Sequence, residues 1–162
     1  LLAFGLLLGS FVDLDEMWIP DRCTIGGMIV GPILSFLIPS MHGVDGHVQS
    51  LIQSLIGLGV GFGILWSVSF FGKLILKKDA MGFGDVKLMG ALGAFFGWQA
   101  VLFIIFVSSL LGSIVGVGLI AFGKKEWQSR IPFGPYIALA ALIWMLGGYV
   151  WWDAYIAWIS GA

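Results

Sequence analysis

Two groups of acidic residues stand at the edges of long uncharged stretches, where carboxylates are costly and can do acid–base chemistry. The first group contains Asp13, Asp15, Glu16 and Asp21, in the stretch FVDLDEMWIPD, and it follows twelve uncharged residues. The second is the single residue Asp85, in MGFGDVK. A purely structural interpretation stays open for both. The first group could end a helix at the lipid headgroups, and Asp85 could be the N-cap of the next helix.

The two glycines before Asp85 give its segment a further property. Gly82 and Gly84 lack side chains, so they permit unusual backbone angles and the close approach of a second chain. We expect them to leave room for an extended substrate backbone beside Asp85. An ordinary glycine loop is the alternative interpretation.

Asp13 and Asp85 are the residues that could act together on a substrate, although 72 positions separate them. Two carboxylates a few Å apart cannot both ionise cheaply, so such a pair holds one proton. The ionised member can take a proton from water, while the protonated member polarises a peptide carbonyl. This chemistry hydrolyses a peptide bond without a metal ion. It requires a fold that brings the two residues to the same place.

The composition indicates the kind of fold that must position them. Of the 162 residues, 59% are hydrophobic and only 10% are charged, against roughly 25% charged in an average soluble domain. So few charges cannot cover the surface of a small water-soluble globule. We predict an all-α polytopic membrane protein with one membrane-embedded domain over residues 1–162. Cys23 is the only cysteine and the net charge is −1, which argues against a disulfide scaffold and against a nucleic-acid partner.

The uncharged runs divide this domain into helices. A helix needs about 20 residues to cross a hydrocarbon core of ~30 Å. The run 88–123 is too long for one crossing, so we place a break at Gly97-Trp98-Gln99. The first run looks like the middle of a helix, and we expect residues upstream of it to be missing. The predicted helical segments number about six: 1–19, 23–39, 50–72, 86–97, 100–122 and 135–158.

Basic residues orient these segments. With six alternating crossings, all eight lysines and arginines fall on one side, which an excess of Lys and Arg marks as cytoplasmic. Both acidic groups then lie on this side. If the short segment 86–97 did not cross, Lys124, Lys125 and Arg130 would move outside and the split would become five to three. We therefore expect 86–97 to cross, with the active site at the cytoplasmic ends of the helices.

Other residues with chemical potential have simpler explanations. His42 and His47 flank Asp45 on the predicted outer side, but a metal site there would need a third strong ligand. We expect a solvated loop and no metal site. We expect Ser108 and Ser109 to hydrogen-bond between helices. Tryptophans near the outer side are typical of an aromatic belt at the membrane interface: Trp98, Trp151, Trp152 and Trp158.

Three stretches together carry a family resemblance: FVDLDEMWIPDRCTI, then MGFGDVKLMGALGAFFGW, then IPFGPYIALAA. In this order and spacing they resemble the prepilin peptidase (type IV leader peptidase) family, polytopic aspartic proteases of the GxGD class. The resemblance implies that Asp13 and Asp85 are the catalytic pair and that Asp15 and Asp21 support them. It also implies cleavage of the short basic leader of prepilins and pseudopilins, at the cytoplasmic face of the bacterial inner membrane.

The resemblance bears on cofactors and partners as well. Many members also methylate the new amino terminus with S-adenosylmethionine, and often carry an upstream domain with paired CxxC motifs. This sequence has neither that domain nor a second cysteine. We therefore expect a peptidase without a cofactor, and S-adenosylmethionine only if methyl transfer is retained. The expected partners are prepilin or pseudopilin substrates and membrane lipid.

Two alternative functions stay open on the sequence. One is a small transporter or channel component in which Asp13 and Asp85 relay protons or cations. The other is a presenilin-like protease, which shares GxGD but carries a PAL motif where this chain has Pro132-Phe133-Gly134-Pro135. Cleavage of a purified basic-leader substrate would separate a protease from a transporter.

Overall fold

The fold is entirely helical in the computed structural model, which describes residues 21–76, 82–121 and 133–161. Three helical runs among the described residues are long and apolar enough to cross a membrane, His47–Ile75, Phe83–Gly118 and Gly134–Ser160, and a shorter apolar helix precedes them. This confirms the predicted all-α class; the predicted segment 1–19 lies outside the described residues. In chain order the elements are α2 (Asp21–Leu37), the 3-10 helix η1 (Pro39–His42), α3 (His47–Leu76), α4 (Phe83–Ala121), α5 (Gly134–Ile143), the π-helical turn η2 (Trp144–Gly148) and α6 (Tyr149–Ser160).

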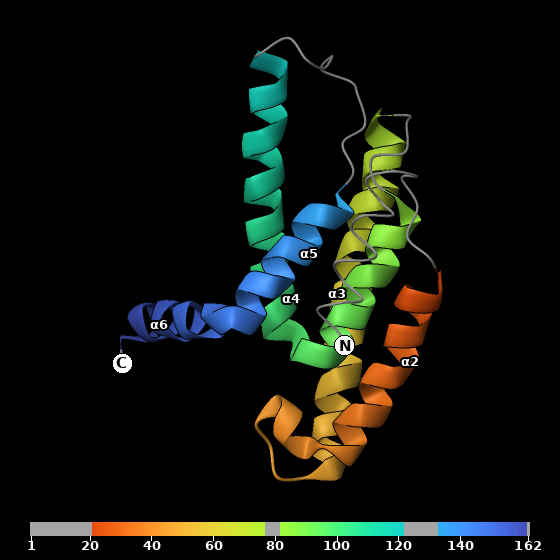
Figure 1. The fold of residues 1–162 in the computed structure, drawn as a ribbon, viewed down its shortest axis with the longest axis vertical. Coiled ribbons are helices and arrows are strands. Elements are labelled where there is room, and N and C mark those ends of the chain that lie inside the picture. Colours follow the sequence, from red (N-terminus) through yellow and green to blue (C-terminus); the bar gives the residue numbers. More distant parts are fainter. Residues whose placement is uncertain (1–20, 77–81, 122–132, 162) are drawn as a thin grey trace.

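Helix α4 contains a reversal of the chain. Gly97 has φ 82° and ψ 175°, a left-handed, non-helical conformation that a residue with a side chain rarely adopts. The part before Gly97, here the first arm, and the part after it, the second arm, run in opposite directions in Figure 1. The predicted break at Gly97 is confirmed, and it makes α4 a helical hairpin.

The first arm packs against α2 and α3 through residues with little or no side chain. A Cβ on Gly57 would collide with the backbone of Gly93, and the reverse is also true. A Cβ on Gly31 of α2 would lie 2.7 Å from the Cβ of Ala94. Helix backbones approach this closely only where side chains are small. These contacts hold α2 and α3 close against the arm of α4 that begins near Asp85.

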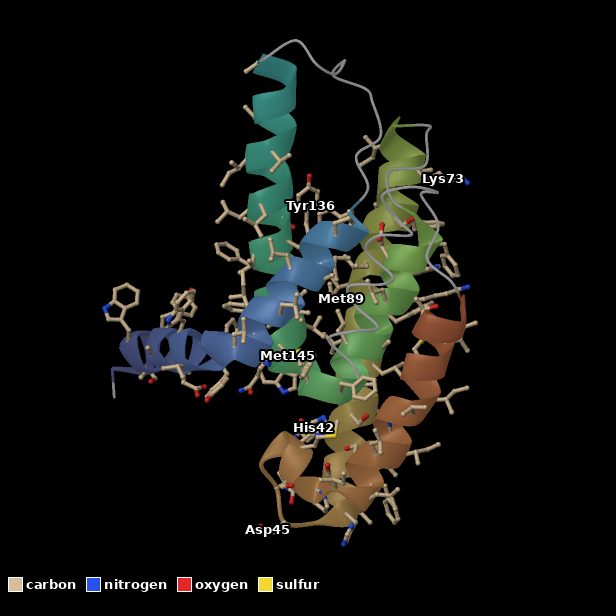
Figure 2. The ribbon with its side chains drawn as sticks, viewed as in Figure 1. His42, Asp45, Lys73, Met89, Tyr136 and Met145 are labelled. Carbon is tan, nitrogen blue, oxygen red and sulfur yellow. The ribbon has the colours of Figure 1, made fainter. Side chains whose placement is uncertain are left out.

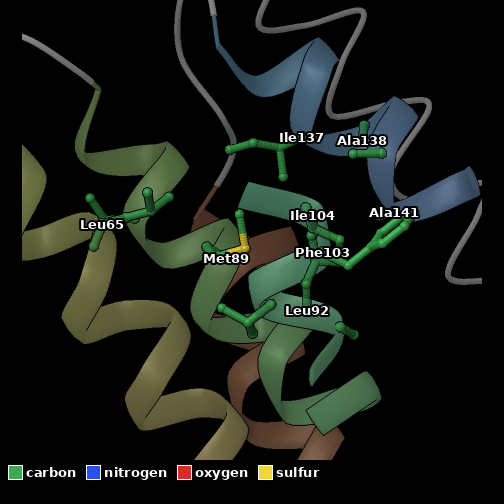
Figure 3. Close-up of a cluster of buried hydrophobic side chains, with 12 residues drawn as sticks. Leu65, Met89, Leu92, Phe103, Ile104, Ile137, Ala138 and Ala141 are labelled. Atoms are coloured by element: carbon green, nitrogen blue, oxygen red, sulfur yellow. The ribbon is translucent and has the colours of Figure 1, made fainter. Parts of the chain in front are cut away.

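The apolar core lies where α5 crosses the hairpin. Met89 and Leu92 of the first arm, Ile104 of the second arm and Ile137 of α5 are all almost completely buried. Figure 3 shows these side chains meeting between the helices. Burial of large apolar side chains against one another therefore holds α5 to both arms of the hairpin.

The predicted segment 135–158 is helical in the structure, within the apolar run Gly134–Ser160, but the chain bends inside it. Gly147 has φ 127°, and the π-helical turn η2 replaces regular α-helix there. Gly148 packs tightly, since a Cβ on it would lie 3.0 Å from Cζ of Phe103. A pair of glycines thus gives the backbone both the freedom to bend and the space to pack. Beyond the bend, α6 runs sideways from the bundle (Figure 1).

The helix ends separate into two groups. The start of α4, the end of α3 and the start of α5 lie toward one end of the molecule, and the turn between α2 and α3 lies at the other (Figure 1). Lys73 and Asp45 mark these opposite ends in Figure 2. We call them the Lys73 end and the Asp45 end. Asp85, in the first turn of α4, belongs to the Lys73 end.

Candidate functional site

Asp85 is buried in the first turn of α4, with 5% of its surface exposed. Helix α4 begins two residues earlier, at Phe83, so Asp85 lies inside the helix rather than at its N-cap position. Its backbone N–H donates a hydrogen bond of 3.1 Å to the carbonyl oxygen of Gly82. A carboxylate in the first turn is favoured by the partial positive charge of a helix N-terminus. This position suits a side chain that must carry negative charge in apolar surroundings.

The two glycines lie next to this carboxylate in different ways. A Cβ on Gly82 would lie 3.5 Å from Oδ2 of Asp85, so a longer side chain at this position would reach over the carboxylate. Gly84 lies within α4 and has helical backbone. Its contribution therefore rests on the absence of a side chain and not on an unusual backbone angle.

An aromatic pair borders the same turn of α4. The ring of Phe83 is about half exposed and meets Phe62 of α3 edge to face, with 6.2 Å between the ring centroids. The Lys87 ammonium lies 5.3 Å from the centroid of the Phe83 ring, within the range of a cation–π interaction. The next residue after Asp85, Val86, is completely buried. The turn therefore has one side in the core and one side that a ligand could reach.

The other predicted site residues lie where the structure says little or nothing. Asp13 and Asp15 are outside the described residues, and Asp21 is the first residue of α2, with its side chain not described. Their proximity to Asp85 stays a prediction. Helix α2 does pack on the first arm: a Cβ on Gly90 would lie 3.2 Å from Cε of Met28. The acidic stretch thus leads into a helix that contacts the helix of Asp85.

A second polar cluster lies near the Asp45 end, and the sequence analysis missed it. Ser35 of α2 donates a hydrogen bond of 2.7 Å to the carbonyl oxygen of Ser50, and the two hydroxyl oxygens are 2.8 Å apart. Nδ1 of His42 lies 3.2 Å from the Ser35 hydroxyl and 3.3 Å from that of Ser50. The signal was available, because Ser35 and Ser50 are polar residues inside apolar helices on either side of His42.

This cluster corrects the prediction of a solvated loop at His42. Its Nε2 is buried, and the ring packs under the hairpin: a Cβ on Gly97 would lie 3.5 Å from Cδ2. Burial lowers the pKa of His42 from its usual value of 6.5, because the imidazolium ion is poorly solvated there. His47 is exposed, and its Nδ1 lies 2.6 Å from the carbonyl oxygen of Phe36. Within the described ranges, no three His, Cys, Asp or Glu side chains gather as metal ligands would.

The buried serines of the bundle hydrogen-bond to helix carbonyls. Ser54 of α3 donates a hydrogen bond of 2.6 Å to Ala94 of the first arm and so links two helices. Ser108 donates to Ile105 in its own helix, at 3.2 Å, so the predicted bond from Ser108 to another helix is wrong. A serine can satisfy its hydroxyl within its own helix, and sequence alone does not separate these outcomes.

The sequence around this site is similar to that of known proteins. Residues 1–117 match the model of the type IV leader peptidase family, and this region includes Asp85 and the acidic stretch. No solved structure matches the chain.

Three curated relatives are each named prepilin leader peptidase/N-methyltransferase. The one from Aeromonas hydrophila is 38% identical over 98% of this chain and 50% of its own length. The one from Pseudomonas aeruginosa is 40% identical over 91% of this chain and 48% of its own length. The one from Legionella pneumophila is 33% identical over 99% of this chain and 52% of its own length. This chain spans about half the length of these relatives. The long apolar helices and the family match together make it a multi-pass membrane protein, and it belongs to the type IV leader peptidase family.

Proposed function

We propose that this chain is a membrane aspartic endopeptidase that removes the short basic leader of type IV prepilins or pseudopilins. The observation that carries the proposal is the burial of Asp85 in the first turn of an apolar helix, within the region that matches the leader peptidase model. A carboxylate with a purely structural role is rarely buried at such a place, because a charge in a membrane helix is costly. The relatives' names supply the substrate class.

The chemistry proposed for the site uses Asp85 and Asp13 as one unit with a shared proton. The ionised carboxyl takes a proton from a water molecule, whose oxygen attacks the scissile carbonyl. The protonated carboxyl donates a hydrogen bond to the carbonyl oxygen and later a proton to the leaving amine. The bond between carbon and nitrogen breaks, and the pair again holds one proton, now on the carboxyl that took it from water; transfer of this proton between the two carboxyls restores the starting state. No metal ion takes part in this sequence.

The remaining residues of the site have supporting roles in the proposal. Gly82 keeps the space over Oδ2 of Asp85 open to a substrate backbone. Gly84 places no side chain on the accessible side of the first turn of α4. Asp15 and Asp21 hold the acidic stretch beside the site and attract the basic leader through charge complementarity.

The proposed location follows from the charges. Lys73 and Asp85 belong to the same end of the molecule, and an excess of basic residues marks the cytoplasmic side. We therefore place the active site at the cytoplasmic face of the bacterial inner membrane. Residues 1–162 form one membrane-embedded domain in this proposal.

The relatives' second activity, N-methyl transfer, would require a methyl donor such as S-adenosylmethionine. Such a ligand needs polar groups that converge on its ribose and amino acid parts. We derive no methyl-transfer step for this chain.

Cleavage of a synthetic substrate by the purified chain in detergent tests the proposal. The substrate has a basic leader followed by an apolar helix, and mass spectrometry detects the product. We expect Asp85→Asn and Asp13→Asn each to lower the rate at least a hundredfold, because general acid–base groups contribute about 10²- to 10⁴-fold.

The matched control is Asp45→Asn, at an exposed position at the opposite end of the molecule. It makes the same chemical change and should leave the rate unchanged. All variants should elute as folded, helical protein. Full cleavage by a folded Asp85→Asn variant would overturn the proposed chemistry. Proton flux in vesicles without any proteolysis would favour the transporter instead.

A further inference from the structure

The stretch IPFGPYIALAA has no part in the proposed chemistry, although its described residues, 133–141, lie in α5 and at its N-cap. Helix α5 begins toward the Lys73 end, as the helix of Asp85 does, and both run from there toward the Asp45 end (Figure 1). Where these two helices touch, the residues that precede the contact in each helix therefore lie on its side nearer the Lys73 end.

One contact between the two helices shows what lies across from Asp85. Ile137 of α5 and Met89 of the first arm are completely buried and meet in the core (Figure 3). Asp85 precedes Met89 by one helical turn and shares its face of α4. Phe133 precedes Ile137 by the same spacing and packs against the core cluster that contains Val86. The start of α5 thus forms the wall of the site across from Asp85.

Tyr136 is the only residue of α5 with a polar side chain. Its ring lies 6.4 Å from that of Phe133 between centroids, and a Cβ on Gly112 of the second arm would lie 3.7 Å from its Cδ2. Its backbone N–H donates a hydrogen bond of 3.1 Å to the carbonyl oxygen of Phe133. The side chain points toward the Lys73 end (Figure 2). Within the described ranges its hydroxyl makes no hydrogen bond.

A peptide substrate in this site would need such a hydroxyl. The backbone around a bond that water attacks must be free of helical hydrogen bonds, so its N–H and C=O groups need other partners. Apolar side chains cannot supply them, and an unpaired buried amide is costly. A tyrosine hydroxyl can both donate and accept a hydrogen bond. Tyr136 therefore offers a partner to either kind of backbone group.

We infer that the Tyr136 hydroxyl hydrogen-bonds to the substrate backbone next to the scissile bond and so holds the peptide against Asp85. This inference rests on the proposed peptidase function and assigns that site a residue that binds the peptide backbone. The hydroxyl contacts a group that every peptide has, so it favours no particular substrate side chain. Because the contact is present in the bound substrate and is kept in the transition state, it lowers KM and leaves kcat unchanged.

Steady-state cleavage of the synthetic substrate by the full chain in detergent tests the contact. Tyr136→Phe removes the hydroxyl and keeps the ring that packs on Gly112. We expect KM to rise about tenfold and kcat to stay within about twofold, because a backbone group of the substrate loses its partner. The control Tyr149→Phe removes the same hydroxyl from a ring of α6 that is 52% exposed, and both constants should stay unchanged.

Ester bonds in the substrate locate the contact. Each peptide of a series has one backbone amide near the scissile bond replaced by an ester, which removes an N–H and weakens the carbonyl acceptor. In the unmodified chain one of these esters should raise KM about as much as Tyr136→Phe does. In the Tyr136→Phe variant the same ester should cause no further rise, because the two changes remove one interaction.

Two results would overturn the inference: an unchanged KM in Tyr136→Phe, or ester effects that are equal in the two proteins. The second result would mean that Tyr136 acts only through packing. Both presuppose that the unmodified chain cleaves the substrate. If it does not, the proposed peptidase function fails and this inference fails with it.

Discussion

At the scale of single residues, two ionisable side chains are shielded from water at opposite ends of the helices, Asp85 almost completely and His42 in part. Asp85 is buried in the first turn of α4. His42 is held by Ser35 and Ser50 beneath the turn of the hairpin. Removal from water opposes the charged form of either group, but the consequences differ. Asp85 is proposed to use its charge in catalysis, whereas His42 stays neutral and joins α2, η1 and α3.

The neutral state of His42 predicts an acid-sensitive fold. Its folded-state pKa is lowered by burial below the unfolded value of 6.5. Between these two values the unfolded chain binds a proton that the folded chain does not, so stability rises with pH in this window. The stabilisation is present above about pH 6.5 and is lost as the pH falls below it.

Thermal unfolding in detergent at pH 7.5 and at pH 5 measures this effect. We expect the unfolding temperature to be lower at pH 5 in the unmodified chain. The variant His42→Gln should reduce that difference, while His47→Gln, at an exposed histidine in the same turn region, should retain it. An unchanged difference in His42→Gln would assign the acid sensitivity to other groups.

At the scale of the elements, close backbone contact positions the arm that carries Asp85. The first arm of α4 lies against α3 at Gly57 and against α2 at Gly31, with no room for added side chains. Ser54 adds a hydrogen bond of 2.6 Å from α3 to the same arm. Between membrane helices, where lipid is as apolar as the side chains, such packing and hydrogen bonds provide the attraction. Asp85 is therefore held by three helices and not by its own helix alone.

Two glycines of α3 provide a matched test of this packing. A Cβ on Gly57 would strike the backbone of Gly93, whereas a Cβ on Gly59 would meet nothing within 4 Å. Overpacking of a tight contact costs about 1–3 kcal/mol, so Gly57→Ala should lower the thermal unfolding temperature in detergent and also reduce cleavage. Gly59→Ala should leave it unchanged or raise it, because Ala favours a helix by about 1 kcal/mol over Gly. Equal behaviour of the two variants would contradict this account of α3 packing on α4.

At the scale of the whole molecule, the helices give the protein two different ends. The Lys73 end carries Asp85 and the exposed ring of Phe83, and the Asp45 end carries the turn with His42 and His47. Helix α6 departs from the bundle near the hairpin turn of α4. The site proposed for catalysis thus belongs to one end of the membrane domain, and the His42 cluster belongs to the other.

The two ends predict opposite accessibility in a cell. In the Cys23→Ser background, a cysteine at position 45 should react with a membrane-impermeant maleimide added to intact spheroplasts. A cysteine at position 73 should react only after permeabilisation, because the basic side faces the cytoplasm. Mass-shift assays on gels give the labelled fractions. Labelling of both positions from the same side would contradict the alternation of the helices.

Several features of this protein followed from local properties of the sequence. Composition and the length of the uncharged runs predicted helices in a membrane, because the bilayer requires every backbone group to bond within its own segment. The position of Gly97 within a run of 36 residues predicted the hairpin, since that run exceeds one crossing. The residue types around Asp85 and Asp13 indicated paired carboxylates, and the pairing itself stays a prediction.

Other features depended on which helix faces meet, and no local pattern records that. The contact of Gly57 with Gly93 joins residues 36 positions apart, and only the packed helices distinguish Gly57 from the exposed Gly59. His42 belongs to a turn that looks solvated in the sequence, yet the hairpin covers it. The chain bends at Gly147 inside a run that is long enough to cross, and Gly148 packs against Phe103 there. Local sequence therefore determined that helices form and roughly where they break, while contacts between distant segments determined what each helix buries and which way it leaves the bundle.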